Sequence, residues 1–170
     1  MEEKMIGFTG ARKLSERDRP LVQSVVTAVE NAGQAISVGC QRGADEFVRA
    51  VAKEYTLFEA SDYGQGKQAF ATRSQAMVKA VATSNRPGLI GFVTKPSPVG
   101  IFPDGRWRSG KQASGSWSTI AFAIGLGLPT IVFCCGEDNT LPAWPNGRWV
   151  VAGDGIWAQG WRWISAPTLV

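Results

Sequence analysis

The sequence predicts an α/β domain, and three observations lead to this prediction. Short runs of β-branched and aromatic residues alternate with stretches of helical periodicity. Most of the runs end in glycine or in a short polar turn. The chain has 170 residues, of which 44% are hydrophobic and 19% charged, and this suits one domain with a substantial core. The alternation predicts a mostly parallel, five-stranded sheet with helices on both faces.

The expected strands and helices follow one another in a regular order. The first helix begins near Ser15, which we expect to be its N-cap with Asp18 three residues on, and Gly33 is placed to end it. Phe70, Arg73 and Met77 lie on one face of the third helix. The expected strands cover residues 5–9, 35–39, 56–60, 88–93 and 129–133, and the expected helices cover residues 15–32, 44–52, 67–82 and 114–126.

The chain changes character after residue 135. Residues 1–135 carry the alternating pattern, which is typical of a three-layer, Rossmann-like nucleotide-binding domain. Residues 136–170 are rich in Pro, Gly and Trp, and we expect an extension packed on the same domain, with a Trp-rich hairpin formed by residues 148–152 and 155–165. Residues 94–113 form a long loop, and such loops are usually functional or mobile.

The composition excludes several classes of function. The chain has no histidine, which removes Ser-His and Cys-His nucleophilic catalysis, and its three cysteines have no metal-ligand spacing. We therefore expect neither a metal nor a cofactor. The sequence shows no signal peptide and no membrane-spanning run, which predicts a cytoplasmic protein with no membrane partner. The net charge of +4 favours an anionic ligand.

Three glycine-containing turns stand where strands pass into helices. Right-handed crossovers bring the carboxyl ends of all parallel strands to one edge of the sheet, so these turns should lie together. Glycine allows a close approach of backbone to ligand, and helix N-termini offer free N–H groups to phosphate. The candidate phosphate-binding residues from these turns are Thr9, Gly10, Arg12, Gly39, Arg42, Gly43, Asp45, Ser114, Gly115, Ser116 and Thr119.

Together with Arg73 in the third helix, these turns resemble those of the SLOG superfamily of Rossmann-like domains, whose members include DprA-like and LOG-like proteins. The resemblance covers residues 5–135, and in size the chain is most similar to the small YpsA/YspA-type members. It implies binding or sensing of a nucleotide or nucleotide-derived phosphate ligand, with Arg73 as a phosphate ligand. LOG-like hydrolases carry a glutamate shortly after their Gly-rich turn, whereas here the turn runs through Thr119 to Ile120 without a carboxylate.

Each singled-out residue also has a plainly structural interpretation. Arg73 interrupts an apolar stripe, so it reaches either solvent or a ligand anion. Asp45 stands in the first turn of a helix, where a carboxylate either caps free N–H groups or contacts a ligand. Seven tryptophans lie in the second half of the chain and are interleaved with arginines. They either pack in the tail and at a dimer contact or stack on bases, and Trp107 is the candidate for stacking in a lid.

The leading prediction is a nucleotide-binding or sensing domain that forms a homodimer or higher homo-oligomer, and whether it also catalyses a reaction on nucleotides stays open. One alternative is a LOG-like N-glycosidic hydrolase acting on a nucleotide, which needs an ionised carboxylate near the sugar. The candidates for that carboxylate are Asp45, Glu46, Glu59 and Asp62. The other alternative is a DprA-like binder of single-stranded nucleic acid.

Overall fold

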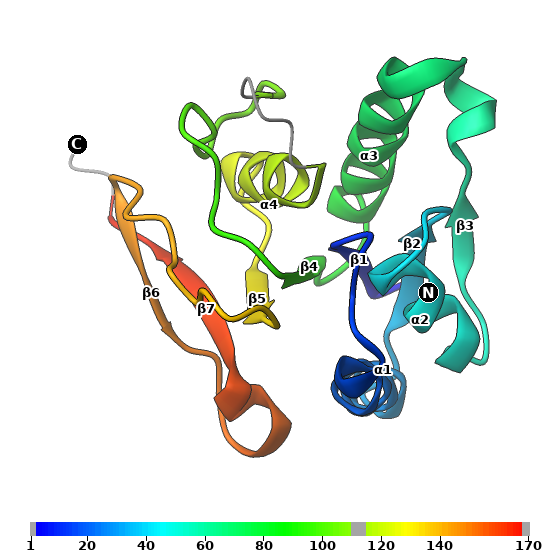
Figure 1. Cartoon of the computed structure of the whole chain (residues 1–170), viewed down its shortest axis with the longest axis horizontal. Helices are drawn as coiled ribbons and strands as arrows, with labels where there is room; N and C mark the ends of the chain where they lie inside the picture. The colour runs from blue at the N-terminus through cyan, green and yellow to red at the C-terminus, as the bar shows by residue number, and fades with distance from the viewer. Residues whose placement is uncertain (1–2, 110–114, 168–170) are drawn as a thin grey trace.

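The computed structural model describes residues 3–109 and 115–167, which Figure 1 shows arranged around a central sheet. The helices and strands follow one another as β1 (Met5–Gly10), η1 (Glu16–Asp18), α1 (Arg19–Asn31), β2 (Ala35–Gly39), α2 (Ala44–Val51), β3 (Thr56–Phe58), η2 (Ala60–Tyr63), α3 (Gly66–Ala82), β4 (Gly88–Val93), α4 (Gly115–Gly125), β5 (Thr130–Cys134), β6 (Gly147–Val151), η3 (Gly155–Gln159) and β7 (Gly160–Ser165).

The sheet has seven strands in the order β3-β2-β1-β4-β5-β7-β6. The first five in this order pair in parallel, whereas β7 pairs antiparallel with both β5 and β6. The expected number of five strands is therefore wrong. The physical reason lies in β5, whose residues Val132 and Phe133 are fully buried. In a five-stranded sheet β5 would be an edge strand, and its backbone N–H and C=O groups on that side would have no strand to pair with. Strand β7 of the C-terminal segment pairs with this edge of β5, with Val132 opposite Trp161 and Phe133 opposite Gly160.

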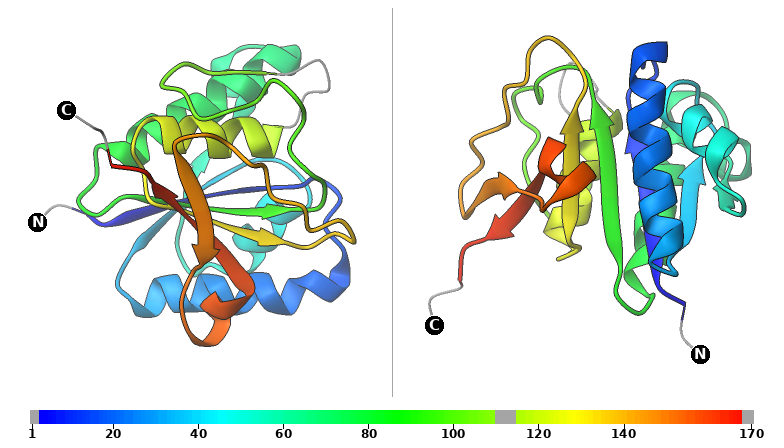
Figure 2. Two further views of the ribbon diagram at one scale, coloured as in Figure 1. Left: turned by 90° about the vertical axis from the view of Figure 1, so that its left-hand side faces the viewer. Right: turned by 90° about the horizontal axis from the view of Figure 1, so that it is seen from below.

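Helices cover both faces of the sheet. In Figures 1 and 2, α1 and α2 lie on one side, and α3 and α4 lie on the other. The α1 side is held by Val22, Val25, Val26 and Val29, which pack with α2 and the strands. The opposite side joins α3 and α4 to Trp144 and Trp163 of the C-terminal segment. The α/β class with a mostly parallel sheet is thus confirmed.

The strand order creates a point where the winding of the chain changes direction. From β1 the chain moves to β2 and β3 on one side, and it then crosses to β4 and β5 on the other. In open parallel sheets, a crevice forms at the carboxyl ends of the two strands that flank such a point. Here those strands are β1 and β4, which pair from Ile6–Gly88 to Gly10–Phe92. The fold therefore predicts the place of a site before any side chain is considered.

The first helix starts later than expected, whereas its end is where the sequence predicts it. Ser15 caps η1, where its hydroxyl accepts a hydrogen bond from the Arg17 N–H, and α1 begins only at Arg19. Gly33 follows α1 with a φ of 73°, as expected of a residue that ends a helix.

Among the described residues, no helix is both long enough and apolar enough to cross a membrane. The same residues contain no group of three or more side chains suited to a metal ion.

Candidate functional site

A cavity of about 830 Å³ lies at the carboxyl edge of the sheet, beside β1 and β4. Its walls come from the loop after β1, the start of α2, the first half of α3, the segment after β4 and the first turn of α4. A volume of this size lies within the range of about 300–1,000 Å³ that is typical of small-molecule sites. A second hollow of about 280 Å³ lies beside β7 and is lined mainly by apolar residues. The first cavity is the candidate site because the chemistry-bearing turns converge on it.

The structure brings most of the predicted site residues to this cavity. Of these residues, Thr9, Gly10, Arg12, Asp45, Arg73, Gly115 and Ser116 line its wall. Four others do not line it: Gly39, Arg42, Gly43 and Thr119. Arg42 is exposed on the surface, and the buried Thr119 hydroxyl donates to the Gly115 carbonyl at 2.6 Å within α4. Ser114 lies outside the described residues.

At three of the turn glycines, Gly10, Gly39 and Gly43, other atoms of the protein occupy the space that a side chain would need. A Cβ on Gly39 would overlap the Arg73 guanidinium, and a Cβ on Gly10 would come within 2.6 Å of the Phe92 carbonyl oxygen. Gly43 has a φ of 76°, and its Cβ would meet the carbonyl oxygens of the loop after β1. Gly115 is different because a Cβ there would meet no atom of the described residues within 4 Å. Only at Gly115, among these four glycines, is the missing side chain matched by open space.

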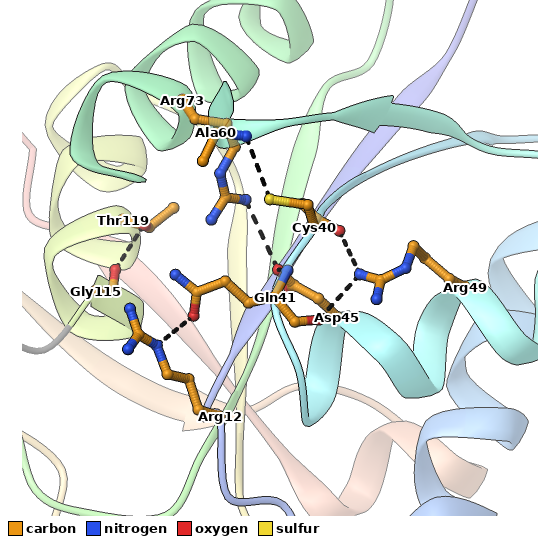
Figure 3. Close-up of polar contacts among 10 residues, drawn as sticks. Arg12, Cys40, Gln41, Asp45, Arg49, Ala60, Arg73, Gly115 and Thr119 are labelled. Carbon is orange, nitrogen blue, oxygen red and sulfur yellow. Dashed lines mark hydrogen bonds and ion pairs between the residues drawn. The ribbon is translucent and has the colours of Figure 1, made fainter. Parts of the chain in front are cut away.

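Arg73 is the central cation of the site. It projects from α3 between the start of α4 and the turn after β2, as Figure 3 shows. The residue is only 5% exposed. Its Nη1 lies 3.7 Å from Asp45 Oδ2, which is an ion-pair distance but too long for a hydrogen bond. Its buried Nε has no hydrogen-bond partner within residues 3–109 and 115–167. A buried guanidinium that is incompletely paired has donors available for an anion in the cavity.

Asp45 is buried beside Arg73 and has an altered acidity. Burial raises the pKa of the Asp45 carboxyl to about 6, although the charge of Arg73 and the hydrogen bond from the Gln41 N–H both act to lower it. That hydrogen bond measures 3.3 Å. Desolvation therefore outweighs the attraction of the neighbouring guanidinium. Glu46, Glu59 and Asp62, the other sequence-based carboxylate candidates, do not line the cavity.

The sequence analysis missed several residues that shape the site. Arg49 of α2 holds the turn after β2, because its Nη1 donates to the carbonyls of Gly39 at 2.6 Å and Gln41 at 3.0 Å. Gln41 in turn accepts a 2.7 Å hydrogen bond from Arg12 Nε (Figure 3). The signal for Arg49 was its position four residues after Asp45, which places both side chains on one face of α2.

The cavity is strongly biased towards anions. Its described lining contains the five cationic side chains of Arg12, Lys13, Lys67, Arg73 and Lys95, and the single carboxylate of Asp45. The first turn of α4 also faces it, and helix N-termini carry N–H groups without intrahelical partners. Phe70 and Trp107 add aromatic surface to the same walls. The arrangement can therefore accommodate an anionic group together with a planar ring.

Most of the late tryptophans are used in packing. Trp117 and Trp144 are buried and meet edge to face with ring centroids 5.7 Å apart, and Trp163 lies 5.9 Å from Trp144. Trp149 completes the group at 5.2 Å from Trp163. Trp107 stands apart from them: it packs edge to face on Phe122 of α4 and lines the cavity.

The chain was compared with models of protein families, with curated proteins and with solved structures. None of the three comparisons gives a match.

Proposed function

We propose that this chain binds a nucleotide, or a nucleotide-derived phosphate ligand, in the cavity at the carboxyl edge of the sheet. The observation that carries the proposal is Arg73, a cavity-lining residue that is only 5% exposed and whose Nε has no hydrogen-bond partner among the described residues. The excess of cationic side chains and the first turn of α4 support a phosphate in particular. Phe70 and Trp107 provide surfaces on which a base can pack. A role as a binder or sensor, like the small YpsA/YspA-type SLOG members that the sequence resembles, is part of this proposal.

The test combines identification of retained ligands with direct titration. Mass spectrometry of the purified protein identifies what it carries, and calorimetry measures nucleoside monophosphate binding to the wild type and to Arg73 variants. We expect Arg73→Ala to weaken binding by roughly 1.5–3 kcal/mol, and Arg73→Lys to recover only part, because an ammonium cannot reproduce the planar fork. Arg17→Ala is the control, since Arg17 is exposed and does not line the cavity. Unchanged affinity in a folded Arg73→Ala variant contradicts the proposal.

A glycosidic hydrolase is the second candidate, and one observation favours it. Asp45 is the single carboxylate in the described lining, and its raised pKa of about 6 suits proton transfer near neutral pH. The same carboxylate is 3.7 Å from Arg73 and accepts the Gln41 N–H, so it already has partners. We therefore expect no release of free base when nucleoside monophosphates are incubated with the protein. Steady release that is lost in Asp45→Asn would favour the hydrolase.

Single-stranded nucleic acid binding predicts a different response. Many phosphate contacts would contribute to the binding free energy, so Arg73→Ala would weaken binding only mildly. The affinity would also fall steeply with increasing salt concentration. The burial of Trp117, Trp144 and Trp163 leaves fewer aromatic faces for stacked bases. Titration with a fluorescent oligonucleotide at two salt concentrations separates the two modes of binding.

A further inference from the structure

Two buried side-chain polar atoms in the described residues have no hydrogen-bond partner, and both belong to residues that line one cavity. They are Arg73 Nε and Ser97 Oγ. Arg73 comes from α3, whereas Ser97 comes from the segment after β4, which forms another wall. Buried polar atoms are almost always hydrogen bonded, so two exceptions in residues of one cavity wall mark two side chains that can turn an unpaired group toward a ligand. The proposed function uses Arg73 and leaves Ser97 unexplained.

The segment that carries Ser97 is built to hold its shape. Ser97 stands between Pro96 and Pro98, and a following proline disfavours helical backbone conformations of the residue before it. Lys95 also precedes a proline, and its carbonyl accepts a 2.8 Å hydrogen bond from the Trp117 indole N–H of α4. The backbone that carries Ser97 and Lys95 is therefore restricted before any ligand binds.

Positive charge is also distributed over two depths of the cavity. Arg73 is buried, and the neighbouring carboxylate of Asp45 offsets part of its charge. Lys13, Lys67 and Lys95 are exposed and carry no such offset within the described lining. A single phosphate placed at Arg73 would leave these lysines and Ser97 without a matching anion, in a cavity of about 830 Å³.

We propose that the ligand carries at least two phosphate groups, one bound at Arg73 and the other at Ser97 and Lys95. The inference rests on the proposed function and narrows its ligand class from nucleotides in general to nucleotides with more than one phosphate. The second phosphate accepts a hydrogen bond from the Ser97 hydroxyl and is neutralised by Lys95, with Lys13 and Lys67 at the rim. The shared chemistry is two phosphates on one nucleoside, either joined as a diphosphate or carried separately on the 3′ and 5′ oxygens.

Calorimetry with matched nucleotides tests the proposal on the full chain. The probes are the 5′-monophosphate, the 5′-diphosphate and the 3′,5′-bisphosphate of adenosine and of guanosine. Each is titrated into the wild type, the double variant Lys95→Gln/Ser97→Ala, and Arg73→Ala. The matched control is Lys79→Gln/Ser24→Ala, because both residues are exposed on helices and neither lines the cavity.

For the wild type we expect one of the two doubly phosphorylated probes to bind at least about tenfold more tightly than the monophosphate, as one added charge-assisted contact provides. The probe with the higher affinity, diphosphate or bisphosphate, shows how the two phosphates are arranged on the nucleoside. The double variant should reduce this ratio to less than about threefold, whereas the control keeps it. Arg73→Ala should weaken all probes. If the monophosphate binds and a second phosphate does not increase the affinity, this inference alone is overturned. The same holds if the second phosphate increases the affinity equally in the double variant. Failure of every nucleotide to bind overturns the proposed function as well.

Discussion

Arg73 shows how far single residues could be interpreted from sequence. The apolar stripe of Phe70 and Met77 predicted that a guanidinium between them needs an explanation, and the structure shows it buried beside Asp45. The sequence could not reveal that Asp45 is its neighbour, because this contact joins α2 to α3. Nor could it reveal that Gly39 is required by Arg73, since a glycine after a strand fits ligand approach equally well.

The acidity of Asp45 gives a prediction about stability and pH. The pKa of the carboxyl in the folded protein, about 6, lies above its ordinary value of 3.8, so folding favours the protonated acid. Its contribution to the free energy of unfolding is therefore largest below about pH 4 and is lost as the pH rises through 6. Asp45→Asn does not titrate. The stability of this variant relative to the wild type should rise by about 2 kcal/mol between pH 4 and 7.

Urea unfolding at a series of pH values measures this difference. The change with pH is the informative quantity, because any fixed effect of the amide beside Arg73 is the same at each pH. A difference that is constant, or that rises as the pH falls, contradicts the raised pKa of Asp45.

The contact of Gly39 with Arg73 gives a second prediction at this scale. In Gly39→Ala the new methyl group would occupy the place of the guanidinium, so Arg73 must move. We expect a loss of stability of about 1–3 kcal/mol, the usual effect of overpacking, together with weaker nucleotide binding. Chemical denaturation and calorimetry measure the two effects. Gly105→Ala is the control, since the nearest atom to a Cβ there is 4.0 Å away, and wild-type affinity in a folded Gly39→Ala variant would refute the argument.

At the scale of elements, the helices and parallel strands were predictable because their signals are local. The valines of α1 repeat with helical spacing, and the strands β1, β2, β4 and β5 are short apolar runs that end in turns. The attachment of β7 to β5 was not predictable, since it depends on a pairing between distant segments. The walls of the cavity show the same division. The turns after β1 and β2 were identified, whereas Ser97 and Lys95 lie in a loop without a periodic pattern.

The first turn of α4 carries a prediction that concerns a whole element. Gly115 begins this helix and lines the cavity, and a Cβ there meets nothing within 4 Å in the part of the chain that the structure describes. Gly115→Val should therefore fold, with an effect on stability below roughly 1 kcal/mol. Its branched side chain would stand before the N–H groups that a phosphate needs, so affinity should fall at least about tenfold.

Gly115→Ala grades this effect, because a single methyl group blocks less of the space and should retain more binding than Val. Thermal unfolding and calorimetry on both variants give the comparison. Equal affinities in the wild type and Gly115→Val would remove the start of α4 from the site.

At the scale of the whole molecule, the C-terminal segment is connected to the cavity. Trp144 donates its indole N–H to the Ile101 carbonyl at 2.9 Å, and Trp117 does the same to Lys95 at 2.8 Å. These two bonds hold the segment after β4, which forms one wall of the site. The tail therefore closes the β5 edge and also supports the loop that carries Ser97.

Trp144→Phe tests whether the C-terminal segment supports the wall of the site. The substitution keeps an aromatic ring in the cluster and removes the hydrogen bond to Ile101, so the free energy of unfolding should fall by about 1–2 kcal/mol. Because that bond anchors the loop, hydrogen exchange should become faster across the described loop residues 95–108, and nucleotide affinity should fall severalfold.

Trp163→Phe is the matched control: its indole N–H donates to Ser165 two residues away, at 3.1 Å, and makes no contact of this kind with the loop. The control should lose similar stability while exchange in the loop and affinity stay near the wild type. If both variants speed exchange in the loop equally, the effect is general loosening of the aromatic cluster, and the specific support of the site by Trp144 is refuted.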